Sequence, residues 1–188
     1  SSYTTGRRGV AATVIVEKIV GSLAETGGSL KECKILGDKV NRNSGSMGVA
    51  FSSCTVPAAG KPTFKLGSDE MEFGVGIHGE PGRRRDKVQP AQEITNELLG
   101  AIIEDLKLEN NGEILLFVNG MGGTPLTELY LLYDNAKKTL DDKNIKIARS
   151  LVGNYCTSLE MQGASLTITK LDQELKKHWD SPVHTAAM

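Results

Sequence analysis

The chain has few of the residues that mark specialised classes of protein. Aromatic residues make up 5% of its 188 residues, and the single tryptophan, Trp179, lies near the end. The charges nearly cancel, with a formal net charge of −1, so strong electrostatic attraction to nucleic acid or to an anionic membrane is not expected. No apolar run approaches the roughly 18 residues that span a bilayer, and no signal-peptide pattern opens the sequence.

Cysteine is also scarce. Cys33, Cys54 and Cys156 are an odd number at wide spacing, which fits neither a zinc site nor a disulfide framework. We interpret them as buried structural thiols. Their pattern favours a reducing compartment, so we expect a cytoplasmic protein.

Hydrophobic periodicity and turn residues predict alternating helices and strands. Ser29 and Glu32 form a capping-box pattern, Asp172 is a candidate N-cap, and Thr124-Pro125 reads as an N-cap followed by proline at the first helical position. Helices are expected over 10–24, 29–43, 90–106, 124–143 and after 172, and strands over 47–56, 70–77, 113–118, 145–152 and 164–171. This order predicts an α/β fold: a single domain with a mixed β-sheet covered by helices.

His78 is the most informative residue. An alternating apolar strand ends beside it, and the chain then breaks into a turn that contains Gly79, Pro81 and Gly82. Glycines let a backbone approach another molecule closely, and they add nothing to a core. We therefore predict that His78 is an exposed reactive group at the end of a strand.

A neutral imidazole can act as a general base, a metal ligand, or a nucleophile toward phosphorus or a carbonyl carbon. Metal ligation is disfavoured because no second histidine or cysteine lies at ligand spacing. His178 and His184 lie near the end of the chain, where we expect capping or surface roles. From the residues alone, the chemistry of His78 stays open.

Two other segments could contact phosphate. The loop 119–124 joins a strand to a helix and could direct backbone amides at an anion, although a tight connection explains its glycines equally well. The run Arg83-Arg84-Arg85 could meet phosphate or an acidic surface, but we interpret it as a solvated loop. The segment 154–160 has no nucleophilic pattern, because Ser158 has no obvious histidine partner.

Several runs together resemble the dihydroxyacetone kinase family, specifically its dihydroxyacetone-binding polypeptide. They extend over the chain in order: Tyr3–Ala11, Gly48–Cys54, Gly74–Gly82, Val118–Pro125, Gly153–Met161 and Asp180–Thr185. The resemblance implies that residues 1–188 are the second domain of that polypeptide. The first domain, which supplies most of the substrate pocket and an acid/base pair in the family, is absent from this sequence.

The resemblance gives His78 a particular role. In the family, the histidine of this motif bonds to the carbonyl carbon of dihydroxyacetone as a hemiaminal, and Gly79 leaves the imidazole uncovered for the substrate. The captured ketone then presents its hydroxyl to a phosphoryl donor. The fragment alone is expected to be inactive.

The resemblance also implies partners. No cofactor is expected in this chain, since the family binds Mg-nucleotide (ATP or ADP) on a helical partner domain or subunit, with ATP or a phosphoenolpyruvate-fed carrier chain as the donor. A homodimer is expected. Two alternatives remain: a non-catalytic paralogue that senses dihydroxyacetone or regulates transcription, and a phosphocarrier in which His78 itself takes phosphate.

Overall fold

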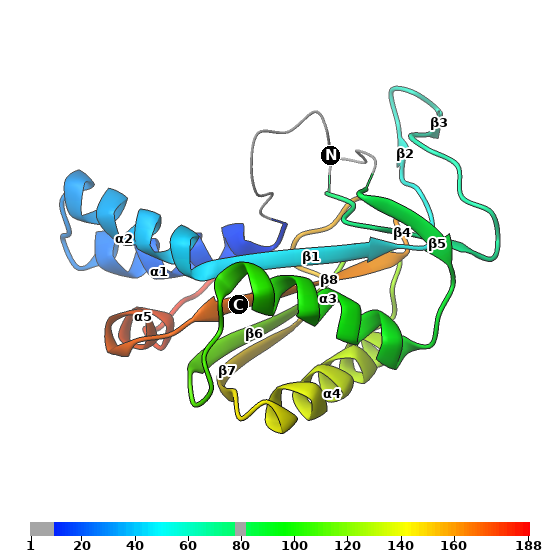
Figure 1. The fold of residues 1–188 in the computed structure, drawn as a ribbon. Helices are drawn as coiled ribbons and strands as arrows, with labels where there is room; N and C mark the ends of the chain where they lie inside the picture. The colour runs from blue at the N-terminus through cyan, green and yellow to red at the C-terminus, as the bar shows by residue number, and fades with distance from the viewer. Residues whose placement is uncertain (1–9, 78–81) are drawn as a thin grey trace.

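The computed structural model describes residues 10–77 and 82–188. Within them the chain forms a mixed sheet with helices on both faces (Figure 1), as the sequence predicts. The elements are α1 (Ala12–Glu25), α2 (Leu30–Asn43), β1 (Ser44–Ala50), β2 (Thr55–Val56), β3 (Lys61–Pro62), β4 (Glu70–Phe73), β5 (Arg84–Lys87), α3 (Ala91–Leu106), β6 (Glu113–Gly120), α4 (Leu126–Asp142), β7 (Lys146–Gly153), β8 (Gly163–Lys170) and α5 (Gln173–Trp179).

The main sheet has the strand order β5-β4-β1-β8-β6-β7. Strand β8 pairs antiparallel with both β1 and β6, and β6 pairs parallel with β7. Strands β1, β6 and β7 therefore run in the same direction and end at the same edge of the sheet. We call this edge the carboxyl edge. A separate two-stranded hairpin, β2–β3, projects beside the end of β1 (Figure 1).

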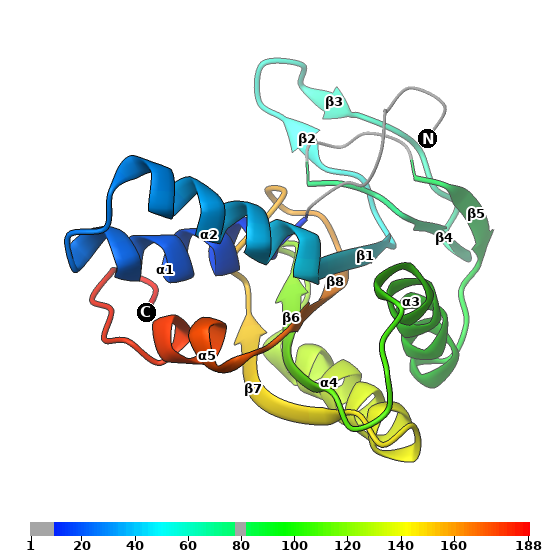
Figure 2. The same ribbon diagram turned by 60° about the vertical axis from the view of Figure 1, so that its left-hand side comes forward.

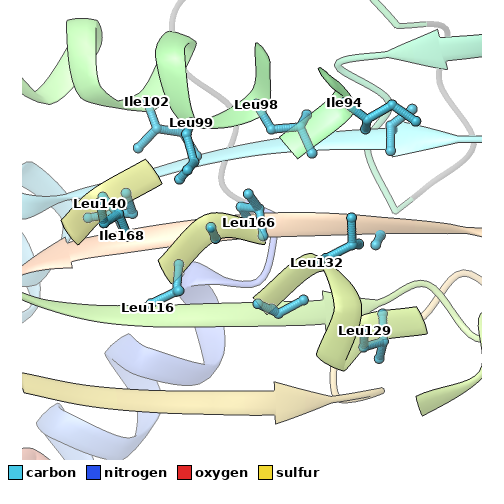
Figure 3. Close-up of a cluster of buried hydrophobic side chains, with 14 of the residues drawn as sticks. Ile94, Leu98, Leu99, Ile102, Leu116, Leu129, Leu132, Leu140, Leu166 and Ile168 are labelled. Carbon is cyan, nitrogen blue, oxygen red and sulfur yellow. The ribbon is translucent and has the colours of Figure 1, made fainter. Parts of the chain in front are cut away.

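Strand β6 shows how the layers form. Ile114, Leu116 and Val118 pack in one apolar cluster with α3 and α4, whereas Leu115 and Phe117 pack in another with α1, α2 and α5. Alternate residues of a strand point to opposite faces, so a continuous apolar run is buried on both sides. Figure 2 shows the two groups of helices on opposite sides of the sheet, and Figure 3 shows the first cluster.

Local capping signals are confirmed at two helices. The Ser29 side chain accepts from the Glu32 amide, and the Glu32 carboxylate accepts from the Ser29 amide, which completes the capping box. Asp172 caps α5 by accepting from the Leu175 amide.

Other boundaries differ from the prediction. The predicted strand 47–56 is two strands, because β1 begins at Ser44 and ends at Ala50 before the chain turns into the β2–β3 hairpin. The predicted loop after residue 56 contains β3. Strand β4 ends at Phe73 rather than residue 77, because Gly74 turns the chain with a φ of 78°.

The helix starts also differ. Pro90 and Pro125 occupy the N-cap positions of α3 and α4, one residue before the first turn. Thr124 is not an N-cap, because its hydroxyl bonds to the start of β8 instead. None of the helices in these two described stretches has both the length and the apolar character needed to cross a membrane.

Candidate functional site at the carboxyl edge

The predicted site residues His78 and Gly79 lie outside the described residues, so their roles remain predictions. The structure does describe residues 74–77, which immediately precede His78. After β4, the Gly74 amide donates to the carbonyl oxygen of Gly48, 2.7 Å away, which places this segment against β1. The carboxyl edge is therefore the part of the fold that leads into His78.

Gly48 lies where this segment crosses the sheet. A Cβ on Gly48 would lie 2.8 Å from the Met121 methyl carbon and 3.2 Å from the Val75 carbonyl oxygen. A side chain at this position would crowd the Val75 carbonyl oxygen, and glycine avoids that contact where residues 74–77 pass the sheet. Beyond the crossing, Ile77 packs against buried residues of two apolar clusters. The segment up to Ile77 is thus held by packing.

A small apolar cluster packs at the carboxyl edge. It joins the start of α1, the end of β1, the 74–77 segment and the loops after β6 and β7. Its buried members are Val10, Ala50, Cys54, Val75, Met121 and Met161, with Phe64 and Ile77 packed against it. Five segments that are far apart in sequence therefore pack together at the carboxyl edge.

Asn119 organises one side of this edge. It lies at the end of β6 and is fully buried. Its Oδ1 accepts from the Tyr155 amide (3.1 Å) and the Cys156 amide (2.8 Å), and its Nδ2 donates to the Cys156 carbonyl (2.9 Å). One side chain therefore fixes the loop that follows β7. The sequence offered only a polar residue at a strand end as a signal for this role.

The glycine loop 120–123 packs against the β7–β8 loop. A Cβ on Gly120 would lie 2.1 Å from Asn154 Oδ1, and a Cβ on Gly122 would lie 2.0 Å from the Leu159 carbonyl oxygen. The amides of residues 121, 122 and 123 already donate to Gly163, Asn154 and Met161. The glycines therefore serve a tight connection, and the alternative of an anion-binding loop is wrong for these amides.

The β2–β3 hairpin is attached to the same edge by polar contacts. The Thr55 amide donates to Glu160 Oε1 over 2.8 Å, and this hydrogen bond lowers the pKa of Glu160. The Phe51 amide donates to the Gln162 carbonyl over 2.7 Å. The first contact attaches the hairpin to the β7–β8 loop, and the second attaches the end of β1 to the same loop.

The basic run is not a solvated loop. Arg84 and Arg85 lie in β5, the edge strand that pairs with β4. Arg84 forms ion pairs with Asp86 and Glu97 and lies over the ring of Phe73, and Arg85 pairs with carboxylates of β4. Charged side chains on an edge strand discourage pairing with another chain. These two arginines stabilise the β4–β5 strand pair rather than form a free phosphate site.

The remaining histidines lie on α5 and after it. His184 is exposed, as predicted. His178 is buried and lies 3.0 Å from the Ser22 hydroxyl through Nδ1, so the expected capping or surface role is wrong for His178. Its ring instead joins α5 to α1, because Leu175 and Trp179 bury α5 in the cluster that contains α1.

The predicted thiols are free. Cys54 and Cys156 are buried, as predicted, whereas Cys33 is half-buried, so the prediction of burial is wrong for Cys33. Burial raises the pKa of the Cys156 thiol, which keeps it protonated at neutral pH. Across residues 10–77 and 82–188, the structure gathers no group of three or more His, Cys, Asp or Glu that could hold a metal ion.

A hollow of about 370 Å³ lies at the opposite end of the sheet, between the start of β7 and α5. Its charged side chains are largely paired with each other. Glu113 pairs with Lys146 and Lys176, and Arg149 pairs with Asp180. We interpret it as a surface ion-pair network, and the carboxyl edge remains the candidate site.

Comparisons with known proteins give one consistent result. A family model described as the Dak1 domain matches residues 1–187. The dihydroxyacetone-binding subunit of the PTS-dependent dihydroxyacetone kinase 1 of Listeria innocua is 49% identical over 93% of this chain. The match covers 53% of that protein, so the chain spans about half its length.

Two solved structures share the fold. One is a dihydroxyacetone kinase operon co-activator, with a TM-score of 0.87 and 33% identity. The match covers 96% of this chain and 57% of the co-activator chain. The dihydroxyacetone kinase of C. freundii matches 99% of this chain and 34% of its own, with a TM-score of 0.81 and 28% identity. A kinase and a regulatory protein therefore share this architecture.

Proposed function

The chain belongs to the Dak1 domain family, and from this premise we propose that it is the substrate-capturing part of a dihydroxyacetone kinase. The observation that carries the proposal is the crossing at Gly48. There, residues 74–77 are held against the sheet immediately before His78. A histidine that follows such a fixed segment can be presented at a constant position.

We propose that His78 captures the ketone covalently. One ring nitrogen donates its lone pair to the carbonyl carbon, the carbonyl oxygen takes a proton, and the other ring nitrogen loses its proton to a base. The product is a neutral hemiaminal that contains the whole ketone. Glycerol has no electrophilic carbon, so this bond separates two small polyols that hydrogen bonds alone would separate weakly.

Capture also fixes the reacting hydroxyl. A substrate bonded at one carbon has lost most of its translational and rotational freedom, which lowers the entropic part of the barrier to phosphoryl transfer. We propose that Gly79 serves this step by leaving the imidazole uncovered. We propose that residues 1–188 are the second domain of a longer polypeptide, whose first domain supplies the acid/base pair.

The phosphoryl donor is proposed to lie on a separate helical domain or subunit that carries Mg-nucleotide. In support, the amides of the glycine loop 121–123 are already paired within this chain. The free thiols agree with a cytoplasmic protein. A homodimer of the longer polypeptide remains part of the proposal.

A regulatory paralogue is the second candidate. It is favoured by one observation, the TM-score of 0.87 with the operon co-activator. Such a protein would share the fold and could bind the ketone, but it would not support turnover. The substrate-capturing role and the regulatory role therefore differ in activity rather than in architecture.

The deciding experiment uses the full-length protein together with its nucleotide-binding partner. Phosphorylation of dihydroxyacetone is measured beside phosphorylation of glycerol at the same concentration. The kinase proposal predicts turnover of the ketone and none of glycerol. Binding of the ketone without turnover, in the presence of a competent donor, would favour the regulatory paralogue.

A further inference from the structure

The loop that carries His78 is closed at its base by two strands. Phe73 of β4 lies opposite Arg84 of β5 in the antiparallel register, so residues 74–83 form the connection between them. The described parts are the outgoing arm, 74–77, and the return arm, 82–83. The contacts of these two arms determine how the base of the loop is held.

Backbone contacts bring the two arms close together. The Arg83 amide donates to the Phe73 carbonyl oxygen over 2.6 Å. A Cβ on Gly82 would lie 2.2 Å from that same oxygen, and a Cβ on Gly74 would lie 2.7 Å from Arg83 Cγ. The base of the loop is therefore narrow, and it leaves no space for a side chain at position 74 or position 82.

One buried carboxylate reaches across this base. Glu72 lies in β4 and is 6% exposed. Its Oε1 accepts from the Gly82 amide over 2.6 Å, and its Oε2 accepts from Arg85 Nη2 over 3.2 Å. The carboxylate therefore contacts the return arm of the loop with one oxygen and β5 with the other.

The position of Glu72 is unusual for a strand residue. Its neighbours Met71 and Phe73 point into the core beneath α3, and Glu72 points to the other face, as does Ala50 opposite it. Burying a carboxylate costs free energy unless charge-assisted hydrogen bonds compensate for it. The β4–β5 strand pair does not need a buried carboxylate to form, because backbone hydrogen bonds between β4 and β5 already hold the two strands together.

We propose that Glu72 is a positioning residue for capture of the ketone: it fixes Gly82, and through Gly82 the return arm of the loop that carries His78. The inference rests on the proposed function of His78. Glu72 does not touch the substrate in this account. It acts by restricting where the loop can hold the imidazole.

Two substitutions of nearly equal shape test this role in the full-length protein. Glu72→Gln keeps an oxygen that can accept from the Gly82 amide, whereas Glu72→Met has the same unbranched length and no strong acceptor. Both remove the buried charge, so the pair differs mainly in the Gly82 contact. Glu70→Gln is the control, since Glu70 lies on the same strand and contacts Arg85 at 3.7 Å, but accepts from the Gly67 amide rather than from the Gly82 amide.

The readout is the fraction of protein that carries a ketone adduct as the dihydroxyacetone concentration is raised, with the folded fraction measured in the same samples. Displacements of about 1 Å in a catalytic group can cost roughly 100-fold. We expect Glu72→Met to need about 10- to 100-fold more ketone for half capture. Glu72→Gln should stay within about threefold of the wild type, and Glu70→Gln within about twofold.

Equal capture by the Met and Gln variants would overturn the positioning role, even if both were less stable than the wild type. Absence of an adduct in the wild-type protein is a different result. It would remove the proposed function of His78 and this inference with it. Because the first outcome leaves wild-type capture intact, the two failures are distinguishable.

Discussion

The hydroxyl of Thr124 and the backbone of Gly163 are joined by two hydrogen bonds in opposite directions. The hydroxyl donates to the Gly163 carbonyl over 2.7 Å and accepts from the Gly163 amide over 2.9 Å. This pair links the start of α4 to the start of β8. The two segments meet at the carboxyl edge, so the contact helps to hold the loops of the candidate site together.

Replacing that hydroxyl with a methyl group should destabilise the fold. Thr124→Val keeps the shape of the side chain but leaves the Gly163 amide without this acceptor, at a cost of about 1–3 kcal/mol. The Gly163 carbonyl still accepts from Met121, which limits the loss. Thr124→Ser keeps the hydroxyl and should cost less than Thr124→Val. Urea unfolding of the three proteins measures the difference, and equal losses in both variants would contradict this account.

Ser165 has the opposite character. Among the buried side-chain oxygen and nitrogen atoms of the described residues, the Ser165 hydroxyl oxygen is the one that has no hydrogen-bond partner. Ser165→Ala should therefore be neutral or stabilising by up to about 1 kcal/mol. Thr167→Val on the same strand is the comparison, because the Thr167 hydroxyl bonds to Ser46 over 2.7 Å. A greater loss in Ser165→Ala than in Thr167→Val would show that Ser165 has an additional role.

Gly122 should tolerate no side chain. Its φ is 118°, and an added Cβ would lie 2.0 Å from the Leu159 carbonyl oxygen, so Gly122→Ala should cost several kcal/mol, above the range of about 0.5–3 kcal/mol for most substitutions. Gly21 is the matched control, since it lies within α1 and an added Cβ there meets nothing within 4 Å. Gly21→Ala should stabilise by about 0.5–1 kcal/mol. Thermal unfolding of both variants distinguishes backbone strain from a general effect of alanine.

Glu113 makes stability depend on pH in the acidic range. Hydrogen bonds from Lys146 and Lys176 lower its pKa from 4.5 to about 2 in the folded protein. A carboxyl whose pKa is depressed on folding stabilises the protein above the unfolded value, and this contribution is lost as pH falls. The contribution of Glu113 should therefore be complete above about pH 4.5 and disappear toward pH 2.

Urea midpoints measured across that range test the assignment. Glu113→Gln should flatten part of the fall in stability, because the amide does not titrate. Glu109→Gln is the control, since Glu109 is an exposed residue near the start of the same strand. The assignment would be wrong if Glu109→Gln flattened the profile as much as Glu113→Gln does.

Features encoded by neighbouring residues could be predicted from the sequence. The Ser29 capping box and the Asp172 cap depend on residues within three positions of each other, and both are confirmed. The mixed sheet followed from the order of helices and strands. The edge strand β5 was missed because its run of charges resembles a loop, while its partners for pairing lie on β4.

The site was predicted less completely because its contacts join distant segments. Asn119 bonds to residues about 37 positions away, and Glu72 bonds across a ten-residue separation. Neither has a local pattern that separates it from an ordinary polar residue. Thr124 was misassigned as a cap for the same reason, since its hydrogen-bond partner Gly163 lies 39 positions away.

Covalent capture of a ketone by His78 underlies both the proposed function and the proposed role of Glu72. Native mass spectrometry of the full-length protein tests it most directly, with dihydroxyacetone and then glycerol added to the wild type and to His78→Ala. We expect a mass gain of one whole ketone in the wild type only, no gain with glycerol, and cooperative unfolding in both proteins. A folded wild-type protein without an adduct, or an adduct that persists in His78→Ala, would contradict it.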